Sequence, residues 1–159
     1  MQQSGARIPD SSEGFSELAV RIRELSAARW GAQRDTPLAG LHARMLAAQH
    51  RLLVCAQADS PVLITGETGT GKELFARAMH LLSRRRAAPY LCVNCAQYQE
   101  GQLVASELFG HRRGSFTGAV ADHRGIFEEA EGGIVFLDEI AELSAVAQAM
   151  LLRTLSEGE

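Results

Sequence analysis

Two carboxylates stand together at the end of a short apolar run in this sequence. The run is Ile134 to Leu137, and the carboxylates are Asp138 and Glu139. Such a run is typical of a buried strand, and open α/β folds bind ligands at the carboxyl edge of their parallel sheet. There, Asp138 would hold a hydrated Mg²⁺ and Glu139 would activate a water as general base. A polar strand end without catalysis explains the pair equally well, so the interpretation depends on a second motif.

A glycine-rich stretch, GETGTGKE, supplies that motif with the full spacing G-x-x-x-x-G-K. Such a turn between a strand and a helix directs successive backbone N–H groups into one concavity, and Lys72 can reach the terminal phosphates of a nucleotide. Glu73 stands where the general pattern has Ser or Thr for magnesium, and a glycine-rich turn without a ligand is the alternative. The predicted nucleotide-binding residues are Gly66, Glu67, Thr68, Gly69, Thr70, Gly71, Lys72 and Glu73.

Three strands and three helices are predicted around these motifs. Apolar, β-rich runs predict strands over residues 61–65, 90–95 and 134–139. Apolar residues at helical spacing predict helices over residues 41–53, 74–82 and 146–155. From residue 61 onward the strands and helices alternate, which favours a parallel sheet with right-handed crossovers and hence the α/β fold of a P-loop nucleotide hydrolase.

Composition excludes several classes of protein. The 159 residues suffice for one domain with a real core, and 46% hydrophobic with 22% charged residues is ordinary for a globular protein. A net charge of −3 gives no general attraction to nucleic acid. Three cysteines without an apolar leader indicate a reducing cytoplasm, and no apolar run reaches the roughly 18 residues of a membrane span.

Two further motifs receive the plainer interpretation. Cys92 and Cys95 lie three apart on a predicted strand, where side chains face opposite ways, so we interpret them as small sheet residues rather than a metal or redox pair. The run Arg84 to Arg86 lacks stacking aromatics and is interpreted as a solvated helix end rather than a nucleic-acid patch.

The stretch ELFGHRRGSFTGAV places Phe116 between two hydroxyl residues, and Gly114 and Gly118 enclose this trio. Glycine flanks predict a mobile or sharply turned loop. An aromatic side chain on such a loop can insert into a pocket of a partner protein, where aromatics often dominate the binding energy. The alternative is that the ring folds against the protein's own surface.

Six segments together resemble the central AAA+ ATPase domain of bacterial enhancer-binding proteins, the activators of sigma-54 RNA polymerase. They are GETGTGKE, VNC, SELFGH with GSFTGA, GIFEEAEGG, FLDEI and LLRTLSEGE. The resemblance covers about residues 37–159 and leaves residues 1–36 as a short N-terminal arm of unknown role. It implies a P-loop NTPase (AAA+) fold, a three-layer α/β/α parallel sheet that is incomplete here and without the helical lid subdomain. The family also has a glutamate at the position of Glu73.

The resemblance implies roles for individual residues. ATP and Mg²⁺ would bind at the glycine-rich loop and at Asp138, with Glu139 activating water. Asn94 matches an asparagine that pairs with the catalytic glutamate and relays the nucleotide state to a surface loop; a polar strand end without signalling is the alternative. The surface loop that contacts sigma-54 would be Gly114, Ser115, Phe116, Thr117, Gly118 and Ala119. Ser115 stands where the family usually has alanine.

The resemblance also sets expectations for activity and assembly. The family works as a homo-oligomeric, hexameric ring and contacts DNA only through a domain that we do not find here. Its sensor strand, arginine fingers and lid would follow Glu159, and losing an arginine finger lowers the rate of phosphoryl transfer by about 10³–10⁵. We therefore expect this chain alone to bind ATP but to hydrolyse it poorly. The alternative is a non-catalytic nucleotide-binding or interaction module that joins or poisons intact activator rings.

Overall fold

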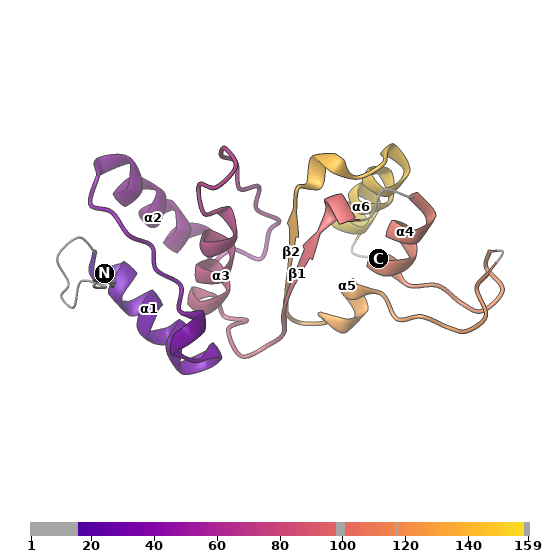
Figure 1. Cartoon of the computed structure of the whole chain (residues 1–159), viewed down its shortest axis with the longest axis horizontal. Helices are drawn as coiled ribbons and strands as arrows, with labels where there is room; N and C mark the ends of the chain where they lie inside the picture. Colours follow the sequence, from indigo (N-terminus) through magenta and orange to yellow (C-terminus); the bar gives the residue numbers. More distant parts are fainter. Residues whose placement is uncertain (1–15, 98–100, 117, 158–159) are drawn as a thin grey trace, which may run out of the picture.

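The structure, a computed structural model, describes residues 16–97, 101–116 and 118–157. Its helices and strands, in chain order, are α1 (Glu17–Trp30), α2 (Ala43–Cys55), α3 (Lys72–Leu82), β1 (Tyr90–Asn94), α4 (Gly101–Phe109), α5 (Ile126–Glu129), β2 (Ile134–Asp138) and α6 (Ala145–Glu157). Short 3₁₀ turns lie at Ala32–Arg34, Cys95–Gln97 and Ile140–Glu142. In Figure 1 the helices α1, α2 and α3 lie on one side of the two strands, and α4, α5 and α6 lie on the other. This layering confirms the predicted, incomplete α/β class.

The two strands β1 and β2 pair in parallel, as the sequence predicts. Their register runs from Tyr90 opposite Ile134 to Asn94 opposite Asp138. Since both strands run the same way, their polar ends meet at one edge of the sheet. Asn94 and Asp138 therefore lie side by side at the carboxyl edge, where ligands bind in open α/β folds.

The predicted strand over residues 61–65 is wrong. These residues form no strand or helix in the structure, and Leu63 is 76% exposed. A strand needs a neighbour that accepts and donates its backbone hydrogen bonds, and no described segment supplies one here. Instead, a groove of about 750 Å³ is lined both by this segment and by β2. A second groove of about 560 Å³ is lined by the same segment together with α2 and α3.

Arg85 joins the two sides of the larger groove. Its guanidinium donates to the backbone oxygen of Gly133, 3.2 Å away, and pairs with the Asp59 carboxylate at 3.1 Å. The residue belongs to an exposed turn after α3, within the run Arg84 to Arg86. At least this member of the arginine run therefore ties the turn to its neighbours.

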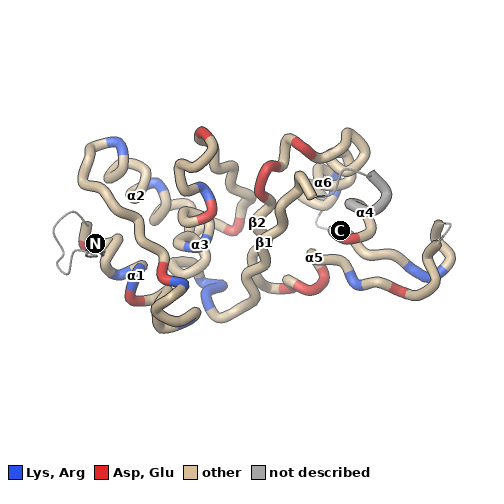
Figure 2. Tube along the Cα trace, viewed as in Figure 1, with Lys and Arg blue, Asp and Glu red and all other residues tan. Residues whose placement is uncertain are grey.

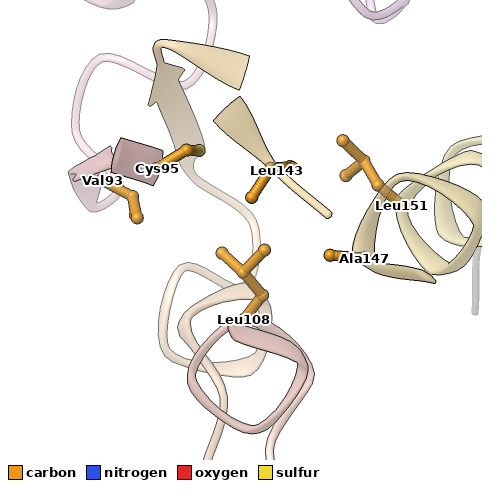
Figure 3. Packing of buried hydrophobic residues seen from close by; sticks show 6 residues of the cluster. All are labelled: Val93, Cys95, Leu108, Leu143, Ala147 and Leu151. Atoms are coloured by element: carbon orange, nitrogen blue, oxygen red, sulfur yellow. The ribbon is translucent and has the colours of Figure 1, made fainter. Parts of the chain in front are cut away.

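Two buried clusters hold the molecule together. One joins the sheet to α4 and α6, and Figure 3 shows its members converging around Leu108: Val93, Cys95, Leu108, Leu143, Ala147 and Leu151. The other joins α1, α2 and α3 and consists of Ala19, Ile22, Leu38, Leu52, Ala78 and Leu81. The helix α1 therefore shares a core with α3, the helix that follows the glycine-rich loop.

Local hydrogen bonds explain where α1 begins and how it is tied down. The Ser16 hydroxyl accepts from the backbone nitrogen of Ala19 at 3.1 Å, which caps the helix. Near its end, the buried Ser26 hydroxyl accepts from the backbone nitrogen of Thr36 at 2.8 Å.

Among the described helices, none has the length and apolar character needed to cross a membrane.

Candidate functional site

The glycine-rich loop wraps around the side chain of Lys72. Its ammonium donates to the backbone oxygens of Gly66 and Glu67 at 3.1 and 3.0 Å. Gly69 and Gly71 have φ angles of 79° and 85°. Residues with a Cβ atom rarely adopt this left-handed backbone conformation. The loop thus places a cation in front of the N-terminus of the 11-residue helix α3, a position that favours an anion.

Thr70 and Gly66 fix the shape of this loop. The Thr70 hydroxyl donates to the backbone oxygen of Glu67 at 2.7 Å. A Cβ atom at Gly66 would lie 2.8 Å from that hydroxyl oxygen. The hydrogen bond of Thr70 keeps the turn tight, and position 66 has no room for a side chain beside it. The backbone of the loop therefore curves around the lysine. Thr68 is exposed in the same turn.

Glu73 forms an ion pair within α3. Its carboxylate lies 2.6 Å from the guanidinium of Arg77, one helical turn on. The geometry therefore directs Glu73 toward its own helix, next to the predicted phosphate site.

The two predicted catalytic carboxylates follow each other at the end of β2. One Asp138 carboxylate oxygen accepts from the backbone nitrogen of Glu139 at 3.0 Å. Glu139 has a φ of 53°. Among the described residues, no other residue except glycine has a positive φ. A left-handed glutamate is uncommon, and strain of this kind gathers at functional sites. Figure 2 shows the acidic residues clustered where β2 ends.

Asn94 lies at the same level on the neighbouring strand. Its side-chain oxygen accepts from the backbone nitrogen of Ala96 at 2.9 Å, which holds the amide at the start of the following 3₁₀ turn. The register with Asp138 brings the predicted relay residue beside the predicted magnesium ligand.

Negatively charged side chains gather at this edge of the sheet. Burial raises the pKa of the Cys95 thiol to about 11, and the carboxylates of Asp138 and Glu139 add to the rise. A negative charge that disfavours a thiolate also favours a cation. Carboxylate oxygens are the ligands that Mg²⁺ prefers, so Asp138 and Glu139 fit a magnesium ion by charge and by donor type.

The two ends of the glycine-rich loop and the two carboxylates line one groove. The 750 Å³ groove is lined by Gly66 and Lys72 on one side and by Asp138 and Glu139 on the other. Residues that are more than 60 positions apart thus line the same space. The arrangement can hold a phosphate chain near Lys72 and a divalent cation near Asp138.

The stretch around Phe116 forms a hairpin with a closed base. His111 and His123 exchange two backbone hydrogen bonds, of 3.0 and 2.9 Å. A Cβ atom at Gly110 would lie 2.6 Å from the His123 oxygen, and one at Gly125 would collide with the backbone of Gly110. Only glycines fit where the two arms cross. Figure 1 shows the hairpin reaching away from α1, α2 and α3.

Phe116 packs on the hairpin itself. Its ring is half-buried and meets the His111 ring edge-on, with the centroids 4.9 Å apart. Gly114 and Gly118 have φ angles of 82° and 105°. Ser115 is exposed, whereas Ala119 is buried at 7% exposure. Of the predicted contact residues, Thr117 lies outside the described part of the chain.

The residues that close this hairpin on its second arm were not predicted from the sequence. His123 and Gly125 have no motif of their own. A signal nevertheless exists, because a glycine and a histidine stand on each side of the loop at nearly equal distances from its centre. Such symmetry is what two antiparallel arms produce.

The comparison with known families decides the identity of this fold. The family model described as the Sigma-54 interaction domain matches residues 38–159. The chain belongs to this family. The resemblance drawn from the sequence is therefore confirmed.

Relatives and solved structures agree with this assignment. The chain is 57% identical over 110 residues to the nitric oxide reductase transcription regulator NorR2 of Cupriavidus necator, covering 69% of this chain and 21% of that protein. It is 47% identical over 150 residues to NorR1 of the same organism, covering 91% and 29%. The crystal structure of NtrX from Brucella abortus in complex with ADP has a TM-score of 0.65 at 33% identity, covering 85% of this chain and 27% of that one. The chain thus spans less than a third of the length of these relatives.

Proposed function

We propose that this sigma-54 interaction domain binds ATP with Mg²⁺ and couples ATP hydrolysis to remodelling of sigma-54 RNA polymerase, so that transcription initiation is activated. One observation carries the proposal most directly. The glycine-rich loop and the Asp138 and Glu139 carboxylates line one groove, and the hairpin bearing Phe116 belongs to the same molecule. The relatives NorR1 and NorR2 are described as transcription regulators, in line with this proposal.

In the proposed ATP site, backbone N–H groups of residues 66–71 and the Lys72 ammonium bind the phosphates. The two carbonyl contacts of Lys72 would be exchanged for phosphate oxygens, which carry more negative charge. Asp138 would hold Mg²⁺, and the ion would supply positive charge beside the phosphates. Glu139 accepts a proton from the attacking water. One NtrX structure with 35% sequence identity is described as a complex with ATP.

The same proposal assigns a path from the nucleotide to the hairpin. Asn94 lies next to Cys95, and Cys95 packs in a buried cluster with Leu108 of α4. The hairpin begins directly after α4. A change at the carboxyl edge can therefore reach Phe116 through one helix, and Phe116 with its neighbours contacts sigma-54.

For the 159-residue chain alone, we propose ATP binding with slow hydrolysis. The segment before the glycine-rich loop lacks strand pairing, and an open groove separates it from β2. Catalysis requires reacting groups held to within a fraction of an ångström, so a loop without this bracing positions ATP poorly against Glu139. Efficient turnover belongs to an oligomeric ring. The unbraced groove also favours a second candidate, a non-catalytic module that joins or poisons intact activator rings.

Sigma-54 binding by a Phe116→Ala variant tests the proposal. Purified chain is mixed with ATP and tagged sigma-54, and the captured chain is quantified alongside ATP affinity. We expect ATP affinity to match that of the parent and sigma-54 capture to be lost. A Val120→Ala variant, which truncates an 82% exposed apolar side chain just beyond the predicted contact residues, is the matched control. Equal sigma-54 capture by the parent and the Phe116→Ala variant would contradict the assignment of the loop.

A further inference from the structure

The imidazole of His111 has neighbours on two sides, one of them buried. Its Nδ1 atom lies 2.6 Å from the hydroxyl of Ser106, a residue of α4 that is only 6% exposed. Its ring stacks on His123, with the centroids 5.6 Å apart. The paired backbone hydrogen bonds between His111 and His123 fix the ring's starting point as well. His111 is therefore tied both to α4 and to the second arm at the base of the hairpin.

Phe116 is the movable partner in its contact with His111. Gly114 and Gly118 flank it, and a Cβ atom on either glycine would meet nothing within 4 Å. The backbone of this tip is held, because Gly114 donates to the Ala119 oxygen at 2.9 Å and Ala119 donates to the Phe116 oxygen at 3.0 Å. The open space around both glycines instead leaves room for the Phe116 ring to turn about its own side-chain bonds. The edge-on contact with His111, at an interplanar angle of 66°, opposes that freedom.

The anchor of His111 leads back to the buried core beneath the carboxyl edge. Ser106 is two residues before Leu108, which is 1% exposed and packs in the cluster with Cys95 and Leu143. Cys95 follows Asn94 directly, and Leu143 follows the 3₁₀ turn after Glu139. Figure 3 shows the Leu108 side chain pointing toward Leu143. A displacement of α4 would therefore carry Ser106 and His111 with it.

We propose that His111 is a positioning residue for Phe116: its imidazole, anchored by Ser106, holds the phenylalanine ring against the base of the hairpin and so withholds it from a partner. Release of this contact makes Phe116 available. The positional part of this inference stands on the hairpin geometry alone. Its consequence for sigma-54 rests on the proposed function.

Two substitutions separate the ring contact from the hydrogen bond. His111→Asn removes the ring but keeps a polar group that can reach Ser106, whereas His111→Phe keeps a ring but removes the polar group. If the ring contact positions Phe116, the phenylalanine variant retains more of the docked state than the asparagine variant does. An exposed histidine on α2, changed as His50→Asn, is the control for the substitution itself. Thermal unfolding of each variant verifies that the fold persists.

Fluorine NMR reads out the position of Phe116 without any partner. The full 159-residue chain is labelled with fluorophenylalanine, and a Phe116→Leu variant assigns the Phe116 signal among the six phenylalanines. A soluble gadolinium chelate then broadens signals in proportion to their exposure. We expect the undocked population of Phe116 to rise about 2- to 10-fold in His111→Asn, the change that an aromatic pair of ordinary strength accounts for. His50→Asn should match the parent, whereas His111→Phe, which keeps a ring but loses the anchor on Ser106, should lie between the parent and His111→Asn.

Equal broadening in the parent and in His111→Asn would overturn the positional inference, and so would equal exposure in the asparagine and phenylalanine variants.

A second measurement captures the variants on tagged sigma-54 without nucleotide. We expect the highest capture for His111→Asn and the parent's capture for His50→Asn. Unchanged capture despite an exposed Phe116 would overturn the withholding role. Absence of capture for every variant, including the parent with ATP, would count against the proposed function and leave the positional result intact.

Discussion

The Arg77 guanidinium lies over the ring of Trp30, 6.0 Å from its centroid. The same guanidinium pairs with Glu73, which directly follows Lys72. Trp30 is the last residue of α1, so one arginine connects the N-terminal helix to the first turn of α3. The helix α1 lies outside the matched family region, yet it is physically joined to the helix that opens at the predicted phosphate site.

Truncating Trp30 should therefore loosen α1 from α3. Trp30 is half-buried and also stacks with His80, so we expect Trp30→Ala to lower the free energy of unfolding by about 2–3 kcal/mol, below the cost for a fully buried tryptophan. Trp30→Phe keeps a ring near Arg77 and should cost less than half as much. Urea unfolding measures both values. If the two variants are equally stable, the ring contact is not what holds α1.

The buried imidazole of His80 should make stability depend on pH. The side chain is 0% exposed, and burial lowers its pKa below the ordinary 6.5. Below pH 6.5 the unfolded chain binds a proton at this histidine while the folded chain does not. Stability is therefore full above pH 6.5 and falls as the pH drops toward the lowered value, by at most about 1.4 kcal/mol per pH unit.

Urea unfolding at pH 7.5 and 5.5 tests this dependence. The difference in unfolding free energy between the two pH values should be smaller in His80→Gln than in the parent. His50→Asn, on the exposed side of α2, is the control and should keep the parent's difference. A parental pH dependence that survives intact in His80→Gln would show that other groups cause it.

Gly125 should resist substitution because of its surroundings rather than its own backbone angle. A Cβ atom there would collide with the backbone at Gly110, so we expect Gly125→Ala to destabilise the chain by about 1–3 kcal/mol and to open the base of the hairpin. Gly114→Ala, which meets open space but needs a φ of 82°, should cost about 1–2 kcal/mol and leave the base closed. Hydrogen exchange at the His111 and His123 amides distinguishes them. Slow exchange at both amides in Gly125→Ala would refute the close crossing.

The strands that the sequence predicts well are those whose local apolar signal is joined by a partner strand. The runs at 90–95 and 134–139 became β1 and β2 in parallel, because each strand finds its partner in the other. The run at 61–65 has the same apolar signal but no neighbouring strand in the described chain. An apolar pattern reports what a segment favours, while a strand also needs a partner for its backbone.

The candidate site divides in the same way. The glycine-rich loop and the Asp138 and Glu139 pair were found from spacing alone, and the structure places both along one groove. The left-handed backbone of Glu139 and the contact between His111 and Phe116 were not foreseeable. The first depends on how the chain turns after β2. The second depends on the bridge between His111 and His123, which are 12 positions apart in the sequence.

Removing the charge of Lys72 should weaken nucleotide binding more than any matched change elsewhere. Lys72 faces the groove and holds two carbonyl oxygens where phosphate oxygens would bind, so Lys72→Ala should lower ATP affinity about 10- to 100-fold, the range of a hydrogen bond to a charged group. Calorimetric titration of ATP with Mg²⁺ gives the affinity. Arg21→Ala removes the same charge from the exposed face of α1 and should bind ATP like the parent. Comparable losses in both variants would mean that net charge, and not the loop around Lys72, governs nucleotide binding.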